Sequence, residues 1–304
     1  MNMIKNIMRL FAVIVVLLLP IGAFSADIPK FRFITSIYTD SKGDSLKQPE
    51  GVACNYKSLV VVADTGKNRL IKYTFSDGSL QGGDELPVSG LSNPLRVQVN
   101  SKGEIFALDG KERRIARISR EGALMGYVTP QGLPAPPDFI PRSFRIDGND
   151  AIYIIDIFNA RVLVLDPSMK FIRLLPFPDN YGFISDLAVN AQGTIFLIDS
   201  VNSVVYSADK NASGFAPLTK PLKENIAFAA NIALDNNGTI YLADQNSSTI
   251  VTINKDGSFQ TRHLSMGWKD GMLHYPTQMC ITNSGDMFIA DRDNNRIGIF
   301  NIVQ

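Results

Sequence analysis

Histidine and cysteine are scarce in this 304-residue chain, which contains two of each and a single tryptophan. Because a catalytic zinc ion takes three protein ligands, two histidines cannot build a three-histidine zinc site. His263 and His274 both lie in one long connection, where packing or solvation is the simpler interpretation. The Gly-x-Ser-x-Gly, Cys-x-x-Cys, Cys-x-x-Cys-His and Walker patterns are also absent, so the commonest sequence signatures of enzyme chemistry are missing.

Long apolar runs are absent too, apart from one near the N-terminus. The run at 10–24 follows Lys5 and Arg9 and ends in small residues, which is the pattern of a secretory signal peptide. It is shorter than the roughly 18 residues that a membrane-spanning helix needs. We therefore predict a signal peptide at 1–25 and an exported mature chain at 26–304, periplasmic or secreted and without a membrane span.

The chain also lacks an excess of charge of either sign. It has 30 Lys and Arg against 29 Asp and Glu, and loss of Lys5 and Arg9 with the signal peptide leaves 28 − 29 = −1. Nucleic-acid binding draws largely on the neutralisation of phosphates by basic side chains. We therefore expect no nucleic-acid partner. A composition that is 45% apolar and 19% charged is typical of a folded globular protein with ample core.

What the sequence does contain is a repeat. An aspartate closes an apolar run six times, at spacings of 45, 47, 43, 45 and 47 residues. These six anchor aspartates are Asp64, Asp109, Asp156, Asp199, Asp244 and Asp291. Nine residues before each anchor stands a turn-forming residue, and six residues before it four of the six units carry glycine, as a tight hairpin favours.

Each unit is predicted to form four short strands. In the fifth unit these are 231–235, 239–243, 249–254 and 258–264, separated by polar turns. Four antiparallel strands in about 40–45 residues is the length of a β-propeller blade. We predict an all-β, six-bladed propeller in a single domain, in which the spare N-terminal strand at 31–38 completes the last blade and closes the ring.

The repeat resembles the NHL family. The segments "QPEGVACNYKSLVVVADTGKNRLIKY" at 48–73 and "YPTQMCITNSGDMFIADRDNNRIGIF" at 275–300 are similar to NHL repeats, and the resemblance extends over 31–304. It implies an exported, bacterial-type NHL propeller. It does not choose a function, since NHL propellers include protein-binding platforms, RNA binders, kinase sensor domains and a few lyases.

Arginine follows four of the anchor aspartates at a distance of five residues. These arginines are Arg69, Arg114, Arg161 and Arg296. An aspartate at the end of the second strand can meet an arginine at the start of the third, so we predict repeated structural ion pairs. A basic ring with Lys67, Lys111, Arg113 and Arg292 that accepts anions on one face is the alternative.

The first residues of the six inner strands should converge at the mouth of a central channel. By their offset from the anchors, these residues are Glu50 or Gly51, Arg96, Arg142 or Ser143, Asp186, Asn231 and Gln278. We predict that Arg96 and Arg142 hold an anionic group, that the two amides donate hydrogen bonds, and that Glu50 and Asp186 orient the arginines. A solvated funnel of paired charges is the alternative.

A metal-dependent lactonase or lyase remains the rival interpretation. "PEGVA" resembles the opening of the first inner strand in gluconolactonase-like propellers, which implies Glu50 as a ligand of one divalent ion such as calcium. Asp186 and Asn231 occupy comparable positions. Arg96 and Arg142 at the corresponding positions are electrostatically unfavourable beside a cation, so we expect no cofactor, no metal and no catalytic residue.

Two aromatic residues in long connections are predicted to contact a partner. Phe139 belongs to the proline-rich segment 130–141, and Trp268 to the connection that leads into the last unit. Aromatic side chains on loops over a rigid scaffold are common recognition anchors. The alternative is that Phe139 fills a gap between blades.

Cys54 and Cys280 fall on the inner strands of the first and last blades, which are neighbours in a closed ring. An oxidising compartment permits a disulfide between them, but we favour two buried free thiols, because cysteine packs well as a small apolar residue.

The sequence thus favours an exported, monomeric propeller that acts as a binding or scaffold module for a protein or a small anionic ligand in the cell envelope. Whether it is an enzyme stays undecided, with a non-enzymatic role preferred.

Overall fold

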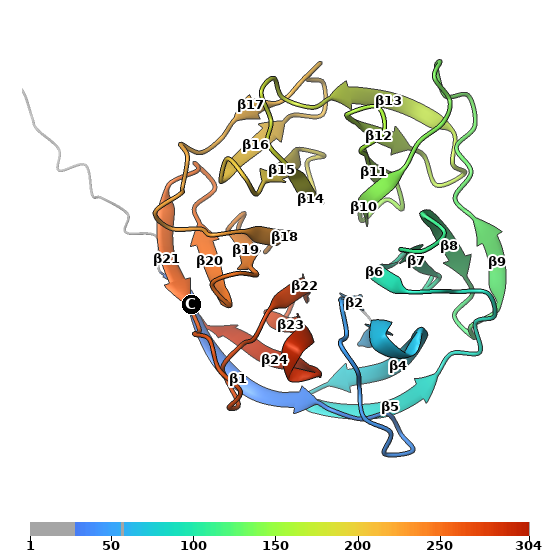
Figure 1. Ribbon diagram of the computed structural model, residues 1–304, viewed down its shortest axis with the longest axis vertical. Coiled ribbons are helices and arrows are strands. Elements are labelled where there is room, and N and C mark those ends of the chain that lie inside the picture. The colour runs from blue at the N-terminus through green and yellow to red at the C-terminus, as the bar shows by residue number, and fades with distance from the viewer. Residues whose placement is uncertain (1–27, 56–57, 304) are drawn as a thin grey trace, which may run out of the picture.

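The strands of this protein form a ring of six blades around a central axis (Figure 1). The structure, a computed structural model, describes residues 28–55 and 58–303; the predicted signal peptide at 1–25 lies outside them. Each blade is a four-stranded antiparallel sheet. The predicted all-β, six-bladed propeller is therefore confirmed.

The blades are numbered here in chain order, and each runs from its inner strand outward. Blade 1 consists of β2 (Gly51–Cys54), β3 (Leu59–Asp64), β4 (Arg69–Ser76) and β5 (Ser79–Glu85). Blade 2 consists of β6 (Pro94–Val99), β7 (Ile105–Asp109), β8 (Arg114–Ile118) and β9 (Leu124–Tyr127). Blade 3 consists of β10 (Pro141–Ile146), β11 (Ile152–Asp156), β12 (Arg161–Leu165) and β13 (Phe171–Pro176). Blade 4 consists of β14 (Ile184–Val189), β15 (Ile195–Asp199), β16 (Val204–Ala208) and β17 (Ala216–Pro217). Blade 5 consists of β18 (Ala229–Leu234), β19 (Ile240–Asp244), β20 (Thr249–Ile253) and β21 (Phe259–His263). Blade 6 consists of β22 (Pro276–Ile281), β23 (Asp286–Asp291), β24 (Arg296–Val303) and β1 (Lys30–Ile37). Two short 3₁₀ turns, η1 (Thr65–Lys67) and η2 (Arg292–Asn294), precede β4 and β24.

The ring is closed by its first strand, as the sequence predicts. Strand β1 pairs antiparallel with β24 from Lys30 opposite Val303 to Ile37 opposite Ile297, and so becomes the outer strand of blade 6 (Figure 1). Pairing the two ends of the chain in one sheet satisfies backbone groups that an open ring would expose.

The hairpin between the first two strands of each blade depends on one residue with a left-handed backbone. The residue six before the anchor aspartate has a positive φ in all six blades. In four blades it is glycine, and in blades 1 and 3 it is Ser58 and Asp150. The turn-forming residue nine before the anchor accepts a backbone N–H with its side chain in every blade, as in the bond from Thr194 N to Asn190 at 2.9 Å.

The core lies between the blades. Six apolar clusters fill the six gaps between neighbouring blades. Alternation along each strand supplies them: Val60 and Val62 of β3 pack toward blade 6, whereas Val61 and Ala63 pack toward blade 2. Within the described residues, no helix is long and apolar enough to cross a membrane.

The two cysteines add a covalent link between blades 1 and 6. Cys54 of β2 and Cys280 of β22 form a disulfide with a Cα–Cα distance of 5.9 Å, across 226 residues of sequence. Our preference for two free thiols is therefore wrong. The inner strands of adjacent blades run close enough at the axis for the side chains to meet, whereas their offsets from the anchors left both orientations open.

The closing strand also contacts blade 5. The ring of Phe31 in β1 stacks on His263 of β21 with a centroid distance of 4.2 Å, and His263 Nε2 lies 3.1 Å from the Thr252 hydroxyl. Burial lowers the pKa of His263 from 6.5 to about 4, because the charged ring is poorly solvated there.

Acidification should destabilise this closure. The unfolded chain binds a proton at His263 near pH 6.5, whereas the folded protein binds it only near pH 4, so stability is lost as pH falls through that window. We expect the free energy of unfolding to fall below pH 6.5 by up to about 1.4 kcal/mol per pH unit. Urea titrations of the His263→Phe variant between pH 7 and 5 should show a clearly shallower dependence.

The control is His274→Gln, which removes the other histidine and leaves the stack of Phe31 on His263 intact. An equally steep loss of stability in wild type and His263→Phe would contradict the assignment.

Candidate functional site

The anchor aspartates organise the end of the propeller where the inner strands begin. All six are at most 1% exposed. Each accepts a hydrogen bond from the backbone N–H of a residue 16 or 17 positions earlier, where the chain approaches the inner strand. These donors are Lys47, Ser92, Ile140, Gly182, Ala227 and His274. The same carboxylate therefore fixes the loops on this face of each blade.

The charge of these carboxylates is balanced differently from blade to blade. Burial raises the pKa of Asp64 and Asp291, although a backbone N–H and an arginine oppose this shift. At Asp199 burial is outweighed by hydrogen bonds from Phe183, Asn202 and Gly182, so its pKa is lowered. An arginine is thus one of several ways to compensate the same buried charge.

The predicted Asp–Arg pairs form in three of the four blades. Arg69, Arg161 and Arg296 donate from Nε to their anchors at 2.7, 2.8 and 2.7 Å. Arg114 is the exception, since its guanidinium lies over the ring of Tyr127 at 3.7 Å from the centroid. The anchor of that blade is satisfied by backbone N–H groups instead. The pairs are therefore scaffolding, as predicted, but not in blade 2.

Three of the predicted channel residues form a hydrogen-bonded belt around the axis, which we call the axial belt: Asp186, Asn231 and Gln278. All are at most 2% exposed. Asp186 accepts from Ser143 Oγ at 2.5 Å and from Asn231 Nδ2, and Asn231 Oδ1 accepts from Met279 N at 3.0 Å. These bonds link the inner strands of blades 3, 4, 5 and 6.

Gln278 continues the axial belt past blade 1 to blade 2. Its amide donates to Val97 O at 3.0 Å and accepts from Val97 N at 3.2 Å, in the manner of a strand. Gly51 of blade 1 leaves the room for this crossing, because a Cβ there would lie 3.1 Å from Gln278 Oε1 and 2.9 Å from Ala63 Cβ. Of the pair Glu50 and Gly51, it is therefore Gly51 that faces the belt.

Above the axial belt, on the face of the anchor aspartates, lies a cavity of about 220 Å³, which we call the aspartate-side cavity. Among its lining residues are the other three predicted site residues, Glu50, Arg96 and Arg142. The structure adds residues that the sequence reasoning did not place there, notably Arg292, Tyr275 and Phe228. Arg292 is recognisable in the sequence as a basic residue of the repeat. Phe228 and Tyr275 share one repeat position, 16 residues before their anchor aspartates, which Phe183 occupies in blade 4.

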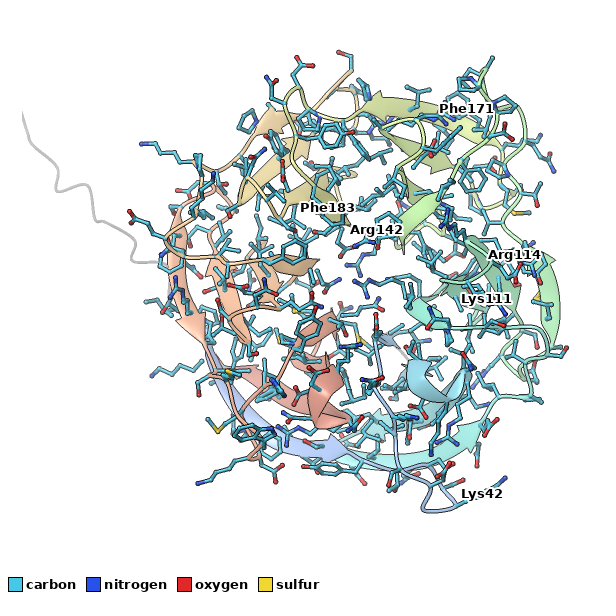
Figure 2. The ribbon with its side chains drawn as sticks, in the orientation of Figure 1. Lys42, Lys111, Arg114, Arg142, Phe171 and Phe183 are labelled. Carbon is cyan, nitrogen blue, oxygen red and sulfur yellow. A yellow bond between two sulfur atoms is a disulfide. The ribbon has the colours of Figure 1, made fainter. Side chains whose placement is uncertain are left out.

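Arg142 is the least constrained cation of this cavity. Figure 2 shows it pointing toward the centre of the ring beside Phe183, and its guanidinium lies 4.6 Å from the centroid of that ring. Within the described part of the chain it makes no hydrogen bond or ion pair. Desolvation and the neighbouring charge of Arg96 lower its pKa, against the opposing effect of Glu50 and Asp186. The side chain is nevertheless exposed at the channel mouth, so its donors are open to a ligand.

Arg96 extends across the channel. It donates weakly to three backbone carbonyls, those of Glu50, Leu95 and Ala230, at 3.2–3.4 Å, and its buried Nε has no partner in the described structure. The predicted role of Glu50 and Asp186 in orienting the arginines is wrong. Glu50 pairs with Arg292 at 3.2 Å, and Asp186 is taken up by the axial belt, so backbone carbonyls position Arg96 instead.

The donor set does not fit the axial calcium ion of the rival interpretation. The side-chain oxygens of Asp186 and Asn231 already accept hydrogen bonds within the axial belt, and Glu50 forms an ion pair with Arg292. The guanidinium of Arg96 lies among the same residues and repels a cation. In residues 28–55 and 58–303, no group of three or more His, Cys, Asp or Glu side chains could hold a metal ion.

The two predicted partner-contact residues differ in exposure. Phe139 is half-buried and packs against the core between blades 2 and 3, while Trp268 is 75% exposed. The proline-rich segment lies on the face of the anchor aspartates, where Arg161 donates to Pro136 O at 2.9 Å. Trp268 is thus exposed on the surface, whereas Phe139 packs between blades, as the alternative interpretation predicts.

Comparison with solved structures finds the same architecture in proteins with different activities. Gluconolactonase from Xanthomonas campestris aligns with a TM-score of 0.65 at 12% identity, over 90% of each chain. A catalytically inactive virginiamycin B lyase from Staphylococcus aureus with quinupristin aligns with a TM-score of 0.62 at 14% identity, over 90% of this chain and all of that one. A chain of a nidogen/laminin complex aligns with a TM-score of 0.58 at 15% identity, over 71% of this chain and 80% of that one.

The comparisons show the fold alone. No protein-family model and no curated protein sequence matches the chain. The resemblance to NHL repeats therefore rests on the sequence pattern, and the neighbours include both enzymes and a protein-binding propeller.

The crossing of Gln278 past Gly51 can be tested by adding one methyl group. In Gly51→Ala, the new Cβ would press on Ala63, on Gln278 Oε1 and on Leu95 O, so the bonds of Gln278 to blade 2 should break or shift. We expect a loss of about 1–3 kcal/mol in the free energy of unfolding, measured by urea denaturation. Gly214→Ala is the matched control, because a Cβ there meets nothing within 4 Å. Equal stability of the two variants would exclude the crossing as a structural constraint.

Proposed function

We propose that this protein is a binding propeller that holds an anionic group, in the first place a carboxylate, in the aspartate-side cavity. The observation that carries the proposal is the guanidinium of Arg142, which lies in the channel mouth on Phe183 without a hydrogen bond or ion pair among the described residues. A carboxylate would accept its donors in the fork geometry that arginine favours.

The surroundings support an anion that carries a small apolar or planar body. Three guanidinium groups face one carboxylate in this cavity, so its charge is +3 − 1 = +2. The aromatic rings of Phe228 and Tyr275 supply flat apolar walls. A volume of about 220 Å³ is below the usual size of a drug-sized site, so it suits a small acid or one acidic side chain of a partner.

Export to the cell envelope and action as a monomer belong to the same proposal, and export rests on the sequence pattern at 1–25. The exposed Trp268 lies on the same face as the cavity and is the candidate anchor for a protein partner. As the only tryptophan of the chain, it also reports such a contact by fluorescence.

The proposal predicts the effect of removing one charge. Benzoate titrated into the protein by calorimetry at low salt should bind with 1:1 stoichiometry, and Arg142→Gln should weaken it about tenfold or more, because a charge-assisted hydrogen bond is lost. The melting temperature should change little, since Arg142 makes no hydrogen bond or ion pair in the described structure and its contact with Phe183 is at an exposed site. Added salt should weaken binding by screening.

The matched control is Arg113→Gln, which removes an exposed arginine on the same face outside the cavity. Equal weakening by both variants would point to a general surface potential, and unchanged binding in Arg142→Gln would refute the site. A peptide with a single glutamate that binds more tightly than benzoate and quenches Trp268 would identify the anion as a partner's side chain.

A further inference from the structure

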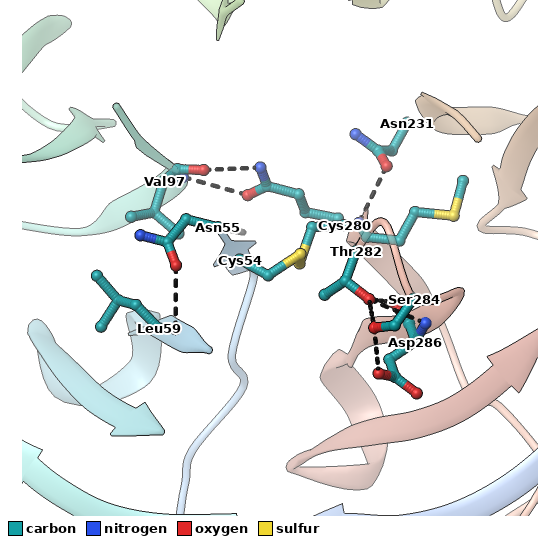
Figure 3. The surroundings of a disulfide bond; sticks show 11 residues. Cys54, Asn55, Leu59, Val97, Asn231, Cys280, Thr282, Ser284 and Asp286 are labelled. Atoms are coloured by element: carbon teal, nitrogen blue, oxygen red, sulfur yellow. Dashed lines mark hydrogen bonds between the residues drawn. A yellow bond between two sulfur atoms is a disulfide. The ribbon is translucent and has the colours of Figure 1, made fainter. Parts of the chain in front are cut away.

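The opposite end of the channel contains a larger cavity of about 420 Å³, which we call the turn-side cavity because it lies where the inner strands turn into the second strands. Its lining shares no residue with the aspartate-side cavity. Cys54 and Cys280 form part of its wall, and Figure 3 shows them joined between blades 1 and 6, with Val97 on one side and Asn231 on the other.

Strand geometry gives this cavity two unlike halves. Side chains two residues apart share a face of a strand. The residues two positions after Arg96, Ser143, Asp186 and Asn231 therefore also face the axis. In blades 2 and 3 these positions carry the polar side chains of Gln98 and Arg145, and in blades 4 and 5 they carry Ala188 and Ala233. All four line the cavity.

The polar half has unused hydrogen-bonding capacity. Gln98 is only 8% exposed and its side chain has no hydrogen bond among the described residues. Arg145 donates from Nη2 to Ile232 O at 2.8 Å, while its buried Nε has no partner in the described structure. A buried donor without a partner, such as Arg145 Nε, is costly in a folded protein unless a ligand or water completes it.

No carboxylate of the cavity neutralises Arg145. Asp147 also lines the cavity, but it accepts from the backbone of Asn149 and Ala151 and from the hydroxyl of Tyr153. Burial lowers the pKa of Arg145; the charge of Asp186 opposes this and that of Arg96 reinforces it. A bound anion would therefore relieve an existing electrostatic cost.

We propose that the turn-side cavity is a second ligand site, which binds a medium-chain monocarboxylic acid. The carboxylate would accept from the Arg145 guanidinium and the Gln98 amide, and the apolar body would lie on Ala188, Ala233 and the neighbouring Leu234. One cation favours a single carboxylate over a phosphate dianion. The volume lies within the usual range for small-molecule sites, about 300–1,000 Å³.

The test uses octanoate as the probe and the alanine methyl groups as reporters. In protein labelled with ¹³C at alanine methyls, octanoate should shift the signals of Ala188 and Ala233 with 1:1 saturation. Ala230, which lines the aspartate-side cavity, reports that site separately. Octanol, which has the same chain without the charge, should bind at least tenfold more weakly. Shifts confined to Ala230, or equal binding of octanol, would overturn this proposal without touching the first.

Three variants and a matched control sharpen the result. Arg145→Met and Gln98→Leu remove the donors at similar volume, and Ala233→Leu fills the cavity from the apolar side; each should weaken octanoate about tenfold or more. Lys102→Gln removes one exposed positive charge near the same end of the channel and should leave the affinity within twofold of wild type. If Arg145→Met fails to fold, the other two decide: octanoate binding within twofold of wild type in both would refute the site.

Discussion

In every blade, the aspartate that closes the second strand is buried and accepts a hydrogen bond from the segment that approaches the inner strand. In blades 2 to 6 it also accepts a hydrogen bond from the turn that follows it, and in blade 1 Arg69 takes this place. A buried carboxylate is tolerated only when several donors compensate it, so each anchor demands a defined path for two loops at once. The loops of one face are thereby fixed to the frame of the sheet. The positions of Glu50 and Arg142 at the channel mouth follow from this constraint, since each lies just after or within such an approach segment.

The sequence predicts most of the fold because the repeat is carried by side chains. The anchor aspartates, the glycines and the alternating apolar residues locate the strands, and strand β1 follows from counting. The features that the sequence does not predict depend on backbone conformation and backbone N–H groups. The residue four after each anchor has a positive φ in all six blades, yet it is never glycine: the six are Asn68, Arg113, Ala160, Ser203, Ser248 and Asn295. The donors 16 or 17 residues before the anchors are likewise N–H groups of unrelated residue types.

The candidate site was predictable only as a set of positions. Register alone placed six polar residues at the starts of the inner strands, and the structure divides them between the axial belt and the aspartate-side cavity. Whether a polar residue is hydrogen-bonded by a neighbouring blade depends on which side chains cross between blades. Gln278, for example, reaches blade 2 through the space left by Gly51. The same limit explains Arg114, whose partner Tyr127 lies on an outer strand without a repeat signature, and the disulfide, whose two half-cystines face each other only once the ring closes.

The axial belt has a consequence for charge. It separates two cavities, and the arginines that line them, Arg96, Arg142, Arg145 and Arg292, outnumber the three carboxylates near the axis, Glu50, Asp147 and Asp186. The sum of these seven groups is +4 − 3 = +1, within a chain whose total charge is close to zero. Low-dielectric walls focus such a field along a cleft. Because Arg96 and Arg145 both reach carbonyl groups of β18 in blade 5, one strand holds a guanidinium for each cavity, and the positive potential extends to both ends of the channel.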